Sequence, residues 1–353
     1  MGSGLTTPRY SGCHALGSGL ITNWDQGGPN PGIRVDNCPI FGLTRPWRSG
    51  LIGRSWSMLF AAADFDVEMY DIDEKQLQGA MAEVRTQLAE LERLGLLRGK
   101  LSAEQQFSNI RTTSEFEDCV RGAFYECVPE NIELKNAVHT RADAVMSDTC
   151  ILASSTSALL PSRLAADIKH KNRFIVAHPT NPPFYAPLVE LVPSPWTDSD
   201  VVPSTKALME KIGQVPVVLK KEIEGFVLNR IQYSIMREGW GLIKDGIVDV
   251  DGIDKVMSAG LGRRYAFMGP FETAHLNADG MKNYADRYAT MIEGVMSTLK
   301  SNDRFGGPVL EQIRTELEAR IPLCDLQERR QWRDRRLAAL TQLNQRIDAE
   351  DAK

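Results

Sequence analysis

Hydrophobic residues follow two patterns along this chain. Short apolar runs are separated by longer segments in which apolar positions recur every three or four residues. The clearest long segment, 75–97, predicts an amphipathic helix. Its apolar positions are Leu77, Met81, Val84, Leu88 and Leu91. A second helix, with small residues for close packing, is predicted over 51–63.

The short apolar runs predict buried strands. We expect strands at 67–70, 123–127, 151–154, 174–177 and 215–219. Helical segments lie between them, as is typical of a parallel sheet covered by helices. Beyond residue 222 the strand signal vanishes, and 225 to about 345 is almost all helix. The pattern predicts an α/β domain followed by an all-helical C-terminal domain.

Residues 1–48 differ from the rest of the chain. They are rich in Gly and Pro and show neither helical nor strand periodicity. We therefore expect an irregular N-terminal segment at 1–48, a sheet domain at 49–221 and a helical domain at 222–345.

Composition narrows the class of protein. The 353 residues are 42% hydrophobic and 25% charged, as in ordinary globular proteins. A net charge of −5 gives no electrostatic reason to expect nucleic acid or membrane partners. The six cysteines lack metal-ligand spacing, so we expect no metal site, and the N-terminus does not resemble a secretion signal. A cytoplasmic enzyme is the expectation.

The candidate chemistry centres on His178, which ends the apolar run 174–177 and precedes a loop rich in proline. A carboxylate, Glu190, follows twelve residues later on a second apolar run. An imidazole with a carboxylate at its other nitrogen is the pairing that a general base requires. The alternative is a core histidine beside a structural glutamate.

A glycine motif suggests a dinucleotide site. Gly50-Leu51-Ile52-Gly53 opens a helix, and Asp71 ends the next strand about twenty residues later. Glycines let the backbone approach a pyrophosphate, the helix N-terminus attracts it, and a carboxylate binds the ribose hydroxyls. Because Asp71 would repel a 2′-phosphate, the motif favours NAD over NADP. The predicted fold class is therefore a Rossmann-type, doubly wound, mostly parallel sheet.

The motif is incomplete at its start. Its first glycine position is Arg48, and Arg45-Pro46-Trp47 does not read as a buried strand. Omitting 43–48 would join Ile40-Phe41-Gly42 to Ser49 and restore a strand that runs into a complete motif. We hypothesise a short insertion or an imperfect gene model here, and weak NAD binding stays open as an alternative.

Several segments between about 49 and 334 carry a family resemblance. They are Gly50–Trp56, Tyr70-Asp71-Ile72, Glu126-Cys127-Val128-Pro129-Glu130, Ser154–Ser157, His178–Glu190, Gly225–Arg230, Arg264–Pro270 and Arg330–Asp334. On these residues the chain resembles the λ-crystallin (L-gulonate 3-dehydrogenase) family of the 3-hydroxyacyl-CoA dehydrogenase superfamily. The resemblance covers roughly four fifths of the chain and excludes 1–48, which occupy the place of the family's first strand.

The resemblance implies four catalytic residues. His178 matches the base that takes the hydroxyl proton, and Glu190 matches the carboxylate that orients it. Ser157 and Asn229 match the polar pair that hydrogen-bonds the substrate oxygen. Ser157 could instead cap a following helix, whereas Asn229 is an unfavourable residue inside a helix unless its side chain has a role.

The resemblance also implies cofactor residues. Leu51 and Ile52 match backbone donors at the pyrophosphate, next to Gly50 and Gly53, and Asp71 matches the ribose acid. Glu130 and Lys135 match residues near the nicotinamide. Read in isolation, these two could simply pair on a helix surface.

The expected reaction is NAD-dependent oxidation of the 3-hydroxyl of a small-molecule hydroxy acid, with L-gulonate giving 3-dehydro-L-gulonate. We hypothesise that Arg264 clamps the substrate carboxylate, although a surface salt bridge is equally compatible with the sequence. The alternatives are a 3-hydroxyacyl-CoA dehydrogenase and a non-catalytic, crystallin-like structural protein. Apolar helical faces and the resemblance together suggest a homodimer.

Overall fold

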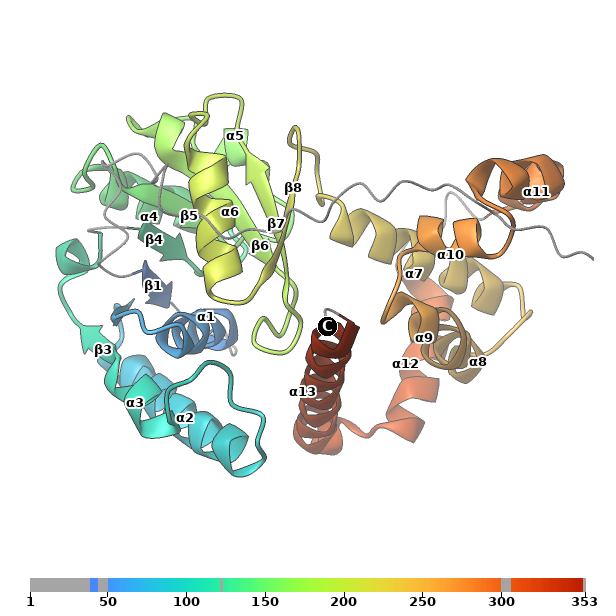
Figure 1. The fold of residues 1–353 in the computed structure, drawn as a ribbon, viewed down its shortest axis with the longest axis horizontal. Helices are drawn as coiled ribbons and strands as arrows, with labels where there is room; N and C mark the ends of the chain where they lie inside the picture. The colour runs from blue at the N-terminus through green and yellow to red at the C-terminus, as the bar shows by residue number, and fades with distance from the viewer. Residues whose placement is uncertain (1–38, 44–49, 121–122, 300–305, 352–353) are drawn as a thin grey trace, which may run out of the picture. The chain divides into compact units, whose positions relative to one another are not determined.

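The computed structural model describes residues 39–43, 50–120, 123–299 and 306–351 (Figure 1). Its described part contains an eight-stranded sheet of order β3-β2-β1-β4-β5-β6-β7-β8. The strands are β1 (Pro39–Leu43), β2 (Val67–Asp71), β3 (Ile110–Thr113), β4 (Ala123–Glu126), β5 (Ile151–Ser154), β6 (Phe174–Pro179), β7 (Leu188–Pro193) and β8 (Val215–Val218). Neighbouring strands are parallel except for β6 and β7, which are antiparallel.

Helices connect the strands and then follow the sheet. The α-helices between strands are α1 (Gly50–Ala62), α2 (Glu74–Arg93), α3 (Ala103–Ser108), α4 (Ile132–Asp143), α5 (Pro161–Leu164) and α6 (Val201–Lys211). After β8 come α7 (Leu228–Lys244), α8 (Val250–Lys255), the π-helix η3 (Val256–Leu261), α9 (Gly262–Tyr265), α10 (Pro270–Leu276), α11 (Met281–Met296), α12 (Gly307–Arg320) and α13 (Leu326–Asp351). This arrangement confirms the predicted fold class.

Two apolar clusters form the core on opposite faces of the sheet. Successive side chains of a strand point to opposite faces, so Phe124 and Tyr125 of β4 belong to different clusters, as do Leu152 and Ala153 of β5. The first cluster is closed by α1 and α2, whose apolar residues repeat at helical spacing. Its largest buried side chains from α1 include Trp56. The apolar face predicted for 75–97 therefore packs against the sheet as part of the first cluster.

The N-terminal prediction needs a correction. We expected 1–48 to be irregular, but Pro39–Leu43 forms β1 and pairs in parallel with both β2 and β4. Two parallel neighbours leave a place that only a further strand can fill, and Pro39 is tolerated because it is the strand's first residue. The alternative in which Ile40-Phe41-Gly42 is strand therefore agrees with the structure. The rest of that segment, 1–38 and 44–48, lies outside the described residues.

Two strands were not predicted as such. β3 is only four residues long, and two of them, Arg111 and Thr112, are exposed. β7 was recognised only as an apolar run after the histidine, and its antiparallel direction was not expected. None of the described helices combines the length and the apolar character that a membrane crossing requires.

Candidate active site

His178 and Glu190 face each other across the antiparallel pair β6–β7. The ladder places the two residues directly opposite, and His178 Nδ1 lies 2.9 Å from Glu190 Oε2. Both residues are buried, with 5% and 1% of their surface exposed. Because a carboxylate only accepts, Nδ1–H is the donor, and the neutral ring carries its lone pair on Nε2. The pair predicted from sequence therefore exists as a hydrogen-bonded unit.

Glu190 is fixed by the start of the helical region. Its Oε1 accepts hydrogen bonds from the backbone N–H groups of Val227 (2.8 Å) and Leu228 (2.9 Å). Burial raises the pKa of this carboxyl, but the hydrogen bonds from His178, Leu228 and Val227 outweigh burial and lower it. Glu190 is therefore held as a carboxylate, which orients the imidazole and stabilises its protonated form.

A strained turn delivers those two N–H groups. Gly225 and Phe226 both have positive φ, at 73° and 50°, a conformation that costs energy for a residue with a side chain. The Phe226 ring is fully buried and packs against His178 with ring centroids 5.5 Å apart. Phe226 thus contributes to the site, although nothing in the sequence pattern singled it out.

Asn229 and Ser157 are joined by a direct contact. Asn229 Nδ2 donates to the backbone carbonyl of Ser157 at 2.7 Å, and Asn229 is buried in the first turn of α7. The Ser157 side chain is exposed. The capping alternative for Ser157 is wrong, because the residue at the N-cap of the next helix, α5, is Leu160.

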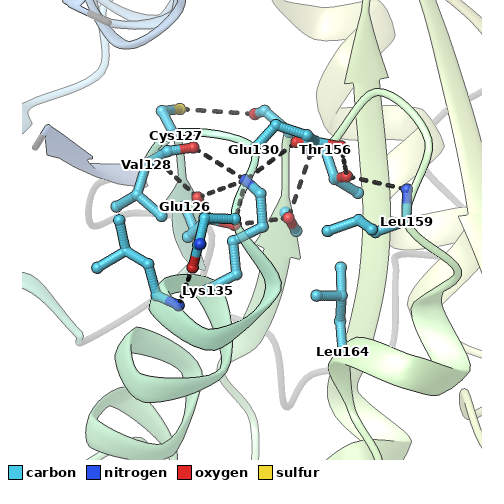
Figure 2. Close-up of polar contacts among 12 residues, drawn as sticks. Glu126, Cys127, Val128, Glu130, Lys135, Thr156, Leu159 and Leu164 are labelled. Atoms are coloured by element: carbon cyan, nitrogen blue, oxygen red, sulfur yellow. Dashed lines mark hydrogen bonds and ion pairs between the residues drawn. The ribbon is translucent and has the colours of Figure 1, made fainter. Parts of the chain in front are cut away.

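Glu130 and Lys135 are also connected to this loop (Figure 2). Glu130 Oε1 accepts from the backbone N–H groups of Ser157 (3.1 Å) and Ala158 (3.2 Å) and from the hydroxyl of Thr156. Lys135 Nζ lies 3.6 Å from Glu130 Oε2. These two residues therefore do not pair on an open helix surface, because Lys135 is only 1% exposed.

These contacts link six of the predicted residues in one chain of interactions. It begins at the His178 imidazole and passes through the Glu190 carboxylate on β7 to the first turn of α7. From there it continues through the loop after β5 to Lys135 on α4. The six residues are His178, Glu190, Asn229, Ser157, Glu130 and Lys135.

The residues predicted to bind the cofactor lie at the carboxyl end of the central strands. Gly50, Leu51, Ile52 and Gly53 form the first turn of α1, which follows β1. Asp71 ends the adjacent strand β2 and is buried. This is the placement that a dinucleotide fingerprint requires.

A cavity of about 1290 Å³ lies beside this turn. Leu51 and Arg54 of α1 line it together with Asp71, and its other walls include Glu83 of α2 and Arg330 of α13. Within the described part of the chain, no acceptor meets the buried Nε of Arg54. A helix N-terminus and an acid at the strand end fit an anionic dinucleotide with free ribose hydroxyls. The Arg54 guanidinium at the cavity wall is paired with Glu83.

Comparisons with known proteins agree with this geometry. Residues 49–223 match the model of the 3-hydroxyacyl-CoA dehydrogenase NAD binding domain, and 225–315 match that of the C-terminal domain. λ-Crystallin of Oryctolagus cuniculus is 46% identical over 85% of this chain and 95% of its own length. The chain belongs to the λ-crystallin branch of the 3-hydroxyacyl-CoA dehydrogenase family.

Other family members broaden the comparison. L-carnitine dehydrogenase of Oceanobacillus iheyensis is 32% identical over 80% of this chain and 85% of its own length. Among solved structures, 5-formyl-3-hydroxy-2-methylpyridine 4-carboxylic acid 5-dehydrogenase, an NAD⁺-dependent dismutase, superposes with a TM-score of 0.73. It is 26% identical, and the match covers 87% of this chain and 98% of that one.

Membership in the 3-hydroxyacyl-CoA dehydrogenase family establishes the reaction class. The protein is an NAD-dependent hydroxy acid dehydrogenase, and NAD is its cofactor. The prediction of an NAD-dependent oxidoreductase is therefore confirmed.

Four further polar residues near the site were missed. They are Glu126, Ser154, Thr156 and His139, all fully buried. Two of them carry a signal in the sequence. Glu126 is a charged residue that ends an apolar strand, and His139 follows Lys135 by four residues, so both side chains lie on one face of α4.

Proposed function

We propose that this enzyme oxidises the 3-hydroxyl of L-gulonate to 3-dehydro-L-gulonate. The observation that carries the proposal is the hydrogen bond between His178 Nδ1 and Glu190 Oε2, which leaves Nε2 as the proton acceptor. L-Gulonate is the substrate implied by the resemblance to λ-crystallins, whose rabbit member is 46% identical. In this proposal 49–221 holds the cofactor, and 222–345 contributes to substrate binding and to dimer formation.

Each proposed catalytic residue has one task. His178 takes the hydroxyl proton at Nε2, and Glu190 stabilises the imidazolium that results. Ser157 and Asn229 hydrogen-bond the substrate oxygen; Asn229 has a second N–H for this, because only one is used on the Ser157 carbonyl. NAD, when bound, would supply the acceptor for the hydride that leaves the carbon bearing this hydroxyl.

The proposed cofactor contacts follow the first turn of α1 and the ends of β2 and β4. The backbone of Leu51 and Ile52, with Gly50 and Gly53, would hold the pyrophosphate, and Asp71 would bind the adenosine ribose. Glu130 and Lys135 would lie near the nicotinamide end. Lys135 faces protein acceptors in this structure, so its role there is to fix Glu130.

Arg264 is proposed to recognise the substrate carboxylate. It lies on α9 and its side chain is exposed, and a guanidinium matches a carboxylate in a bidentate fashion. Arg264→Ala should raise KM for L-gulonate by about tenfold or more, the loss expected for a charged hydrogen bond. Steady-state kinetics measure this, and an unchanged KM would exclude the role.

A substrate panel tests the proposed activity. NADH formation is measured with L-gulonate, with L-carnitine and with 3-hydroxybutyryl-CoA, because members of the family act on different 3-hydroxy compounds. The proposal requires L-gulonate to have the highest kcat/KM. L-Carnitine is the second candidate, supported by the 32% identical dehydrogenase. No turnover of any of the three, together with no NADH fluorescence change, would favour a structural protein.

The proposal includes a homodimer and a cytoplasmic location. The helical region exposes large apolar side chains that a second copy of the chain could cover. They include Tyr233 and Met236 of α7, Phe271 of α10, and Met291 of α11. Light scattering after gel filtration should give twice the chain mass; the mass of one chain at micromolar concentration would contradict the dimer.

A further inference from the structure

The carboxylate of Glu126 lies at the centre of a buried polar network (Figure 2). Glu126 is the last residue of β4 and is 0% exposed. Its Oε1 accepts from the backbone N–H of Val128 and, at 3.0 Å, from Lys135 Nζ. Its Oε2 accepts from Ser154 Oγ at 2.6 Å and from Lys135 Nζ at 3.1 Å. One side chain thus connects the end of β4, the end of β5 and α4.

His139 is the fourth group on this carboxylate. Its Nε2 lies 3.2 Å from Glu126 Oε2, and since a carboxylate only accepts, the ring nitrogen is the donor. His139 is fully buried, and its ring packs edge-on against Phe174 of β6 at 5.1 Å. The carboxylate therefore accepts hydrogen bonds from the turn after β4, from β5 and from α4.

Lys135 carries the effect of Glu126 towards the cofactor side. Its Nζ donates to Glu126 and to the Val128 carbonyl at 2.9 Å, and it forms an ion pair with Glu130 Oε2 at 3.6 Å. Glu130 in turn accepts from the backbone N–H groups of Ser157 and Ala158. Lys135 and Glu130 therefore connect the Glu126 carboxylate to the loop that presents Ser157. The Glu126 backbone carbonyl also accepts from the Ser155 N–H at the start of this loop.

This network is poorly explained by stability alone. Buried ion pairs contribute little net stability, because the loss of hydration offsets much of their attraction. They do select one geometry, since every donor and acceptor in a buried network must be satisfied at once. At this position the selected geometry is that of the turn after β4 and of the loop after β5, the two segments that flank the proposed nicotinamide site.

We propose that Glu126 is a positioning residue that acts through Lys135 and Glu130 to hold Ser157 and the β5 loop in place for hydride transfer. His139 and Ser154 complete its coordination. The proposal rests on the proposed roles of Ser157 and Glu130. Glu126 itself is fully buried, so its proposed effect on the reaction is indirect.

Amide hydrogen exchange tests the proposal without relying on turnover. Glu126→Gln keeps the shape of the side chain and removes its charge, so Lys135 loses its carboxylate partner. The Ser157 and Ala158 amides of the cofactor-free protein should then exchange about tenfold faster or more, the loss expected for weakened hydrogen bonds to a charged group. Glu133→Gln is the matched control, because Glu133 lies on α4, the helix of Lys135, but is exposed; exchange at Ser157 and Ala158 in this variant should match wild type.

Kinetics provide the second readout. At a temperature where circular dichroism shows the variant folded, Glu126→Gln should lower kcat about a hundredfold, as a displacement of about 1 Å can do. KM for the hydroxy acid should change less than kcat. A merely structural role predicts lower thermal stability with wild-type exchange at Ser157 and wild-type kcat, and that result would overturn the proposal.

Two further arms keep the outcomes separate. Should Glu126→Gln fail to fold, Ser154→Ala removes the hydroxyl that donates to Glu126 Oε2 and accepts from the Thr156 N–H. Wild-type exchange at Ser157 together with wild-type kcat in this variant would contradict the proposal. If wild-type enzyme turns over no hydroxy acid, the proposed function fails, and the exchange of Ser157 and Ala158 alone decides whether Glu126 positions the loop.

Discussion

At the scale of single residues, the site depends on which partner each polar group has in the interior. The imidazole of His178 has a buried carboxylate at one nitrogen. Glu126 has four donor groups around one carboxylate. In both cases a buried carboxylate is tolerated without water because hydrogen-bond donors replace its hydration. A substitution that removes the charge, or that removes a proton donated to it, should therefore disturb the site.

His178→Gln should leave the fold intact and reduce kcat by about 10²- to 10⁴-fold, because glutamine can hydrogen-bond Glu190 but cannot act as a base near neutral pH. Turnover of the best substrate and the circular dichroism spectrum measure the two effects. A variant with near wild-type kcat would remove His178 from the mechanism.

The stability contributed by Glu126 should depend on pH. Burial raises its pKa, but Lys135, His139 and Ser154 reverse this and bring the pKa to about 2. Because the folded-state pKa is depressed, the stabilisation is complete above the ordinary value of 4.5 and is lost as the pH falls towards 2. Glu126→Gln should therefore cost about 3 to 5 kcal/mol at neutral pH.

Urea unfolding of wild type and Glu126→Gln over a pH series measures this difference. The gap between the two proteins should narrow as the pH is lowered below about 4.5. A gap that stays constant over this range would mean that the carboxylate is not preferentially ionised in the folded state.

At the scale of elements, the turn before α7 connects the two regions of the site. Gly225 adopts a φ of 73°, and the two N–H groups that follow Phe226 bind Glu190. A Cβ at Gly225 would meet only Arg230 and Asn229 at ordinary contact distances. The requirement for glycine therefore comes from the backbone conformation and not from crowding.

Gly225→Ala should cost about 1 to 2 kcal/mol, the price of a left-handed conformation for a residue with a Cβ. It should also lower kcat, because any relaxation of the turn moves the N–H donors of Glu190. Gly246→Ala is the matched control, since Gly246 has a φ of 67° with open space around it. Equal stability losses with equal kcat in the two variants would contradict a role for the turn in the site.

At the scale of the whole molecule, the cavity beside α1 is built from distant parts of the sequence. Leu51, Asp71 and Arg330 line one space although they belong to α1, β2 and α13. The end of the chain also packs on the sheet domain, because Ala338 is buried in the first apolar cluster and Thr341 donates to the Tyr185 carbonyl. A ligand in this cavity should therefore stabilise the folded chain.

NADH at about one hundred times its Kd should raise the free energy of unfolding by about 2.7 kcal/mol and increase Tm by several degrees. NADPH at the same concentration should have a much smaller effect, because its 2′-phosphate would meet the buried carboxylate of Asp71. Thermal unfolding followed by circular dichroism measures both. Equal shifts with the two cofactors would contradict the assignment of Asp71.

The order of elements, the parallel sheet and the His178–Glu190 pair could be predicted from the sequence, because apolar periodicity and strand ends are local properties. Lys135 and Glu130 were predicted too, but only through the resemblance, since a helix-surface pair has the same local pattern. Whether 39–43 forms a strand could not be decided from the sequence. The strand forms because it pairs with β2 and β4, and both lie further along the chain.

Tertiary structure alone decided which donors surround Glu126, how Phe226 meets His178 and where α13 contributes to the cavity. Each of these depends on a contact between segments that are far apart along the chain. The type of a side chain does not show which distant residue it will contact. The sequence by itself determined the elements and singled out His178 and Glu190; long-range packing determined the environment of this pair.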